Sequence, residues 1–305
     1  MMEMISLSTL LNPPKGLPLL DILLISLILG MLHGATPDEH TWPITFSYAI
    51  GKYSTKGGMK AGFLFSLGFT IQRAFLTTLG FIGLAEIYQK YNLDGPVYLV
   101  VGVVMGVAGA YILRGRYLHL PIDKLLKSEH HSEKTGGVEL HDVPLKMTVV
   151  HGLIAGFGFG AYASIITFVL APQVPSVFYA PLPGVFFGIG TMIMQILFGA
   201  LFGNILRAKK LSVAEISYIA RKTAGRVLYY GGIIFVIAGL LIIVFPIIDN
   251  FAIPTGNPIP NLNAIDIGFL LVILVVGLIG ISSIIYGIRE ASKISKNDKA
   301  KIMKL

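Results

Sequence analysis

The sequence predicts an all-α polytopic membrane protein, with about seven transmembrane helices arranged as two inverted three-helix repeats and one extra helix. Three observations support this fold class: an apolar composition, seven long apolar segments, and motifs that recur in order along the chain. Hydrophobic residues make up 54% of the chain and charged residues 13%, with a mean hydropathy of +0.76. A soluble domain contains about 25% charged residues. The chain has no cysteine, which excludes disulfides, thiolate metal sites and CxxC redox chemistry.

Each of the seven segments approaches the roughly 20 apolar residues that a helix needs to cross a bilayer. The predicted spans are 17–36, 61–85, 97–114, 147–170, 184–206, 227–248 and 266–288. The segment 211–226, just before the sixth span, is interpreted either as a short amphipathic helix on the membrane surface or as a solvated connector.

Basic residues alternate between the loops. They are concentrated in the first, third and fifth loops and in the C-terminal tail, whereas the second, fourth and sixth loops contain only Lys90. Because basic loops remain on the cytoplasmic side, we expect a multi-pass protein of the cell membrane with its N-terminus outside and its C-terminus in the cytoplasm. The formal net charge of +8 therefore reflects orientation in the lipid bilayer and does not indicate a nucleic-acid partner.

Three motifs occur twice in the same order, which predicts an internal repeat. They are "HG" at 33–34 and 151–152, "GFLFSLG" at 62–68 with "GVFFGIG" at 184–190, and a glycine followed six residues later by "AG" at 102–109 and 232–239. An odd number of spans in each half places the halves in opposite orientation, as in many secondary transporters. Glycines are also frequent in membrane helices for packing alone. The predicted units are a first three-span repeat (1–114), a cytoplasmic loop containing histidines (115–146), a second three-span repeat (147–248) and a seventh span with a basic tail (249–305).

The stretch "MLHGATPDEHTWPIT" (31–45) places polar residues and two prolines at the end of an apolar segment. Pro37 has no backbone N–H and its ring would clash with the carbonyl of His33 in a continuous helix. We therefore expect a break between His33 and Pro37, followed by a second half-helix over 37–51. In this interpretation Thr36 caps the second half-helix, Pro37 occupies its first turn and Glu39 closes a capping box.

The same break predicts a metal site. In an intact helix His33 and His40 would lie two turns apart, about 10 Å along the axis, but a break allows both to approach Asp38 and Glu39. Imidazole and carboxylate ligands suit nickel, cobalt, zinc or iron, and ionisable groups within membrane spans mark substrate paths. The alternative is that Asp38 and Glu39 only complement a helix N-terminus.

The motif "HGATPDEH" resembles the signature of the nickel/cobalt transporters (NiCoT) and of the related NicO proteins, which belong to the lysine-exporter superfamily. "GFLFSLGFT" and "GVFFGIGTM" resemble two further motifs of the first family, in the same order. This resemblance implies that His33, Asp38 and His40 are metal ligands. The chain departs from the family pattern in three ways: Glu39 is an extra residue, Phe69 replaces a histidine, and Thr191 or Met192 replaces an aspartate.

Four further polar residues lie within the predicted spans. His151, the repeat counterpart of His33, is interpreted as a further metal ligand, as a gate, or as a histidine at the membrane interface. Gln72 and Gln195 either supply ligands or form hydrogen bonds between helices, and Arg73 requires an anionic partner, for which Asp38 or Glu39 is the candidate. In the loop 115–146, four histidines lie near acidic residues, a composition that either collects divalent metal or is simply solvated.

The predicted function is secondary transport of a divalent transition-metal cation by alternating access, with the metal as substrate and no other cofactor. No nucleotide-binding motif occurs, so we expect coupling to an ion gradient and no enzymatic activity. The alternatives are an exporter of a small organic solute and an intramembrane metal-dependent hydrolase built on His33, Glu39, His40 and His151, although the chain has no HExxH pattern. Lipid and the metal ion are the expected partners, and a homo-oligomer is compatible with the sequence.

Overall fold

The computed structural model describes residues 6–83, 90–91, 93–114, 134–135, 138–139, 145–158, 160–208 and 211–293. Within them the chain is almost entirely helical, and the strands form only two short antiparallel pairs. The α-helices are α1 (Leu7–Leu11), α2 (Leu19–Ala35), α3 (Trp42–Gly51), α4 (Thr55–Phe81), α6 (Asp94–Leu113), α7 (Lys146–Ala155), α8 (Ala161–Ser164), α9 (Leu182–Asn204), α10 (Val213–Val244), α11 (Ile267–Val272) and α12 (Ile281–Lys293). The paired strands are β1 (Lys134–Thr135) with β2 (Val138–Glu139) and β3 (Ala252–Pro254) with β4 (Ala264–Asp266).

Shorter helical turns connect or continue these elements. π-helical segments follow α8 (Ile165–Leu170) and link α11 to α12 (Ile273–Gly280). The 3₁₀ turns are Ala171–Gln173, Val177–Tyr179, Ile205–Ala208 and Pro246–Asn250.

The prediction of an all-α membrane protein is confirmed at this level. Within the described residues, four helical segments are long and apolar enough to cross a membrane: Asp94–Leu113, Val177–Asn204, Glu215–Val244 and Ile267–Ala291. Helix α4 exposes an apolar stripe in which every fourth residue points outward, and the stripe consists of Phe63, Leu67, Ile71 and Phe75. Large apolar side chains repeated on one exposed helix face are suited to lipid rather than water.

The helices are interrupted at two places in the described residues. The predicted first span and the half-helix expected after it are α2 and α3, separated by residues 36–41. The predicted fourth span is divided between α7 and α8, with glycines at 156, 158 and 160. The segment 211–226 is helical, but the prediction of a separate surface helix or connector is wrong. It forms the first turns of the long helix α10, which begins with a capping box between Ser212 and Glu215.

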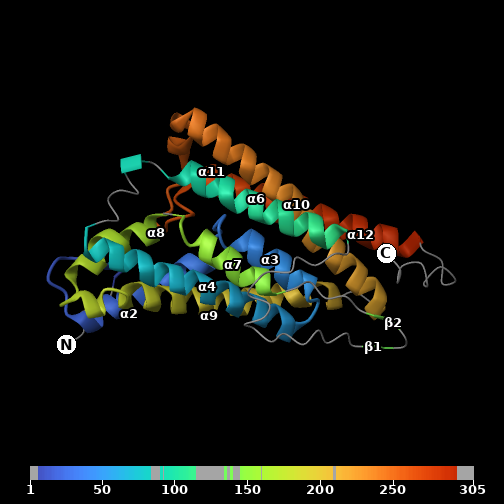
Figure 1. The fold of residues 1–305 in the computed structure, drawn as a ribbon, viewed down its shortest axis with the longest axis horizontal. Coiled ribbons are helices and arrows are strands. Elements are labelled where there is room, and N and C mark those ends of the chain that lie inside the picture. Colours follow the sequence, from blue (N-terminus) through green and yellow to red (C-terminus); the bar gives the residue numbers. More distant parts are fainter. Residues whose placement is uncertain are drawn as a thin grey trace.

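The helices form two layers with two short helices between them (Figure 1). One layer contains α2, α4 and α9, and the other contains α6, α10 and α12. Between the layers lie α3 and α7, which contact each other and also contact helices of both layers. The start of α2 and the end of α12 lie at opposite ends of the long axis (Figure 1).

Glycines bring the helices of each layer into backbone contact, because a Cβ atom at these positions would overlap the neighbouring helix. In one layer, Gly62 of α4 packs on the carbonyl of Gln195, and Gly184 of α9 packs on the carbonyl of Arg73. In the other layer α6 and α10 cross at the pair Gly102 and Gly232. On either side of that crossing, the contacts are Gly109 with the carbonyl of Gly225, and Gly239 with the carbonyl of Gly95.

Candidate functional site

The break in the first span lies where the sequence predicts it, but its details differ. Thr36 ends α2 and does not begin the next helix: its N–H and its hydroxyl both donate to the carbonyl of Leu32, each at 2.9 Å. Helix α3 begins only at Trp42, with Pro43 in its first turn, so the predicted start at Pro37 and the capping box closed by Glu39 are wrong.

Asp38 organises the turn between the two half-helices. Its Oδ1 accepts the backbone N–H of His40 at 3.0 Å, and its carbonyl accepts the N–H of Trp42 at 2.9 Å. An aspartate that binds the backbone two residues ahead stabilises a turn in competition with a helix. This turn delays α3 by five residues and holds His33, Asp38 and His40 at the break.

His33 and Asp38 form a buried pair across the break. The Nδ1 atom of His33 lies 3.6 Å from Oδ2 of Asp38, and each residue is 5% exposed. The imidazole is stacked on Phe69 and on Phe187, with ring centroids 5.5 and 5.2 Å away. Its Nε2 atom is buried and has no hydrogen-bond partner among the described residues.

Glu39 and His40 form a second pair beside the first. His40 Nε2 lies 3.2 Å from Oε1 of Glu39, which also accepts a hydrogen bond from the hydroxyl of Tyr98 at 2.9 Å. The Tyr98 ring is stacked on His40. The His40 ring also packs against Gly158, where a Cβ atom would overlap the imidazole. The Nδ1 atom of His40 is buried and, within the described part of the chain, makes no hydrogen bond.

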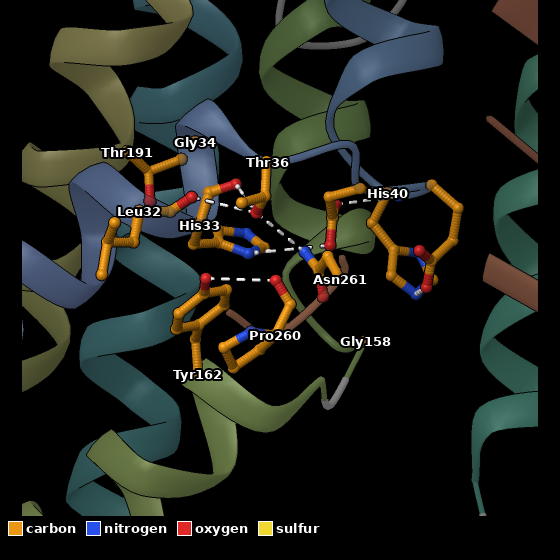
Figure 2. Close-up of polar contacts among 12 residues, drawn as sticks. Leu32, His33, Gly34, Thr36, His40, Gly158, Tyr162, Thr191, Pro260 and Asn261 are labelled. Carbon is orange, nitrogen blue, oxygen red and sulfur yellow. Dashed lines mark hydrogen bonds and ion pairs between the residues drawn. The ribbon is translucent and has the colours of Figure 1, made fainter. Parts of the chain in front are cut away.

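The loop between β3 and β4 covers the break, and we call residues 255–263 the lid. Asn261 Nδ2 donates to the hydroxyl of Thr36 at 3.1 Å, and the hydroxyl of Tyr162 donates to the carbonyl of Pro260 at 3.2 Å (Figure 2). Asn261 has a φ of 65°, a left-handed conformation that asparagine tolerates better than most residues. The lid is therefore attached to the end of α2 and to α8.

His151 lies apart from the two pairs. Its Nδ1 atom is 3.1 Å from the hydroxyl of Tyr48 and 2.9 Å from the carbonyl of Met147, and the residue is fully buried. Its Nε2 atom is buried and lacks a hydrogen-bond partner in the described residues.

The other predicted polar residues surround the break. Gln195 Nε2 donates to the carbonyl of Gly34 at 3.2 Å, which confirms a hydrogen bond between helices for this residue. Arg73 is buried, donates to the carbonyl of Gly158 at 2.6 Å and places its guanidinium 4.8 Å from the centre of the Phe69 ring. Its pairing with Asp38 or Glu39 stays a prediction. The amide of Gln72 is buried without a partner among the described residues.

The predicted ligands thus form two histidine–carboxylate pairs rather than one cluster. In the residues that the structure describes, no three His, Asp or Glu side chains are close enough to hold one metal ion. In a metal site, a carboxylate commonly accepts one imidazole N–H and leaves the other nitrogen to bind the metal. In each pair a carboxylate oxygen lies near one imidazole nitrogen, at 3.6 and 3.2 Å, and the other nitrogens, His33 Nε2 and His40 Nδ1, have no hydrogen-bond partner among the described residues. The histidines of the loop 115–146 lie outside the described residues.

Sequence reasoning did not identify Tyr98, Tyr162 and Asn261. Tyr98 and Tyr162 lie in apolar segments, where an aromatic residue is more often part of the core. Asn261 lies in a polar loop where asparagine is common. The contacts that make these residues part of the site join positions 59 to 225 residues apart. No pattern in the sequence would have indicated them.

Comparisons with protein-family models, with curated proteins and with solved structures found no match to this chain.

Proposed function

We propose that this protein is a secondary membrane transporter of a divalent transition-metal cation of the nickel/cobalt class, with its substrate site at the broken first span. The observation that carries the proposal is the two buried histidine–carboxylate pairs at that break. Ionisable groups are costly inside a membrane protein and persist there where they serve a substrate or proton path. A metal cation is the substrate that imidazole nitrogens oriented by carboxylates bind best.

The two pairs suggest how the cation is held. His33 Nε2 and His40 Nδ1 are the nitrogen donors, and Asp38 and Glu39 orient the rings and offset the positive charge. The residues 36–41 between α2 and α3 are not helical, so small changes in this turn bring the two imidazoles together or separate them. In this proposal the substrate site forms when the pairs converge and opens when they separate.

The helix contacts support an inverted repeat, an architecture on which many alternating-access transporters are built. When position 62 is matched with 184, Arg73 is matched with Gln195, so the contact of Gly62 with Gln195 becomes the contact of Gly184 with Arg73. The contacts between α6 and α10 show the same symmetry. When position 102 is matched with 232, the contact of Gly109 with Gly225 becomes the contact of Gly239 with Gly95. Among the described residues each half also contains an interrupted helix, at 36–41 and after Ala155. We therefore propose seven crossings, with the site between two halves of opposite orientation.

Orientation in the membrane is part of the same proposal. The start of α2 and the end of α12 lie at opposite ends of the long axis (Figure 1), which supports an odd number of crossings. The basic loops then lie in the cytoplasm and the N-terminus lies outside.

The only tryptophan of the chain provides a direct test. Trp42 is two residues from His40 and contacts Phe198, with ring centroids 5.0 Å apart and the planes tilted by 51°. Ni²⁺ and Co²⁺ are paramagnetic and quench a nearby indole, so titration of the purified protein with either ion should decrease Trp42 fluorescence to saturation. Mg²⁺ serves as a control, because this hard ion prefers oxygen ligands.

Transport is then measured with the protein in liposomes, using Ni²⁺, Co²⁺, Zn²⁺ and Fe²⁺ in parallel. The proposal predicts flux of at least one of these ions, and loss of both quenching and flux in His33→Ala. Saturable quenching without flux, together with hydrolysis of a substrate, would indicate the hydrolase. Neither quenching nor metal flux would overturn the proposal and leave the organic-solute exporter.

A further inference from the structure

Helices α3 and α7 form a seam that begins at the candidate site. At the site end, the His40 ring packs against Gly158. Two turns further along α3, the hydroxyl of Tyr48 lies 3.1 Å from Nδ1 of His151. From the first contact to the second, residue numbers rise from 40 to 48 on one side and fall from 158 to 151 on the other, so α3 and α7 run antiparallel. At roughly 1.5 Å per helical residue, the Tyr48–His151 contact lies about 10 Å from the site.

The seam contains buried polar atoms without hydrogen-bond partners. Thr45 is three residues from Tyr48 and Thr148 is three residues from His151, so each lies on the same helix face as the residue that makes the contact. The hydroxyls of Thr45 and Thr148 are buried and form no hydrogen bond with another described residue. By contrast, Ser47 on another face of α3 donates to the carbonyl of Pro43 at 2.6 Å.

Unpaired polar atoms in the interior of a membrane protein require an explanation. Each costs free energy if it stays dry, and within the membrane such groups are tolerated where they line a water-filled cavity or path. Several of them along one seam, starting at the substrate site, indicate a path for water and the ion.

The Tyr48–His151 contact closes this seam near its far end. Tyr48 is 0% and His151 1% exposed, and their ring centroids lie 5.5 Å apart. Beyond the contact, α3 continues only to Gly51 and α7 begins at Lys146, so about one helical turn remains before the basic loops. At the other end of the site the lid is attached through Asn261 and Pro260.

We propose that the substrate moves between the site and the basic-loop face along the α3–α7 seam, and that the Tyr48–His151 contact is the gate on this path. His151 then acts as a gate rather than as a metal ligand. The identity of the passing ion rests on the proposed function. The seam and its gate do not, because both are testable as access of water without any metal.

The chain has no cysteine, so single cysteines are introduced into an otherwise unchanged protein. Thr45→Cys reports on the seam, and Ser47→Cys is the matched control on the same buried helix. Lys52→Cys identifies which membrane face a preparation exposes. Sealed vesicles of both orientations are treated with a membrane-impermeant thiol reagent in metal-free buffer, and the labelling rate of each variant is measured.

We expect Thr45→Cys to react slowly and only from the face at which Lys52→Cys reacts, whereas Ser47→Cys stays unlabelled. Adding Tyr48→Phe, which removes the hydroxyl and keeps the ring, should raise the Thr45→Cys rate about fivefold, as expected for one lost hydrogen bond. His151→Gln serves as a second gate variant if Tyr48→Phe folds poorly. Equal rates for Thr45→Cys and Ser47→Cys, or rates unchanged by both gate variants, would overturn the proposal.

The result is independent of metal transport. If His33→Ala still transports nickel but the labelling pattern holds, the proposed function fails and the gated seam stands. If His33→Ala abolishes transport but the gate variants change no labelling rate, the function stands and the seam is wrong.

Discussion

His33 Nδ1 lies 3.6 Å from Asp38 Oδ2 across the break between α2 and α3. The two residues are five positions apart, and a continuous helix would place their side chains on different faces. Their pairing therefore depends on the turn that Asp38 forms with His40. Asp38 has two roles, as partner of His33 and as organiser of the break.

Removal of single members of the site should abolish transport. We expect His33→Ala, Asp38→Ala and His40→Ala each to eliminate metal flux while the protein still reaches the membrane. A lost ligand or its partner leaves the cation incompletely coordinated in a buried site, where its desolvation is no longer offset. Flux in liposomes and membrane abundance are measured together. Normal flux in both histidine variants would be incompatible with a metal site at the break.

Glu39→Gln separates two roles of this carboxylate. Glutamine still accepts the hydrogen bond of Tyr98 but no longer offers a negative charge to His40. If the charge orients His40, nickel binding followed by Trp42 fluorescence should weaken roughly 10- to 100-fold, as for other partners of metal-binding histidines. Tyr98→Phe is the control, and a much smaller effect is expected because the carboxylate remains. Equal effects of the two variants would indicate that Glu39 has only a structural role.

Gly158→Ala should displace His40 without removing any candidate ligand. A Cβ atom at Gly158 overlaps the imidazole, whereas one at Gly160 meets no atom within 4 Å. We expect Gly158→Ala to weaken nickel binding about tenfold or more through misplacement of the ligand, and Gly160→Ala to leave it unchanged. Titration of Trp42 fluorescence compares the two. Unchanged binding in Gly158→Ala would argue against His40 as a ligand in the arrangement described.

The lid should loosen when its contact with Thr36 is lost. Asn261→Gly removes the side chain and keeps the left-handed backbone, which glycine adopts without strain. The loss of one hydrogen bond, about 1 kcal/mol, predicts faster hydrogen exchange over 252–266. Asn261→Ala should exchange faster still, because alanine is strained at a φ of 65°. Exchange rates equal to those of the unaltered protein would mean that this contact does not hold the lid.

Membrane orientation is tested with single cysteines at exposed positions. Phe178 and Ile247 are 88% and 77% exposed. Phe178 lies in the predicted fourth loop, and Ile247 lies just after α10, beside the predicted sixth loop. Phe178→Cys and Ile247→Cys should react with an impermeant reagent applied to intact cells, and Lys56→Cys should react only after the membrane is opened. The reverse pattern would overturn the orientation and the cytoplasmic position of the loop 115–146.

The sequence by itself determined the class of protein and the position of the break. Long apolar segments are stable as helices in lipid because every backbone hydrogen bond is made within the segment. Pro37 interrupts the first of these segments through its missing N–H, a local effect that needs no tertiary information. The recurring glycine motifs predict an internal repeat, whereas the helices that these glycines bring into contact are given by the structure.

Only the tertiary structure decided how the site is built. The start of α3 at Trp42 depends on the Asp38 turn, which competes with the helix start that the local pattern favours at Pro37. Glu39 binds Tyr98 of α6, and Thr36 is contacted by Asn261 from a loop 225 residues away. His151 was separated from His33 and placed opposite Tyr48 by the packing of α7 against α3. These are contacts between distant segments, and no local propensity encodes which of them form.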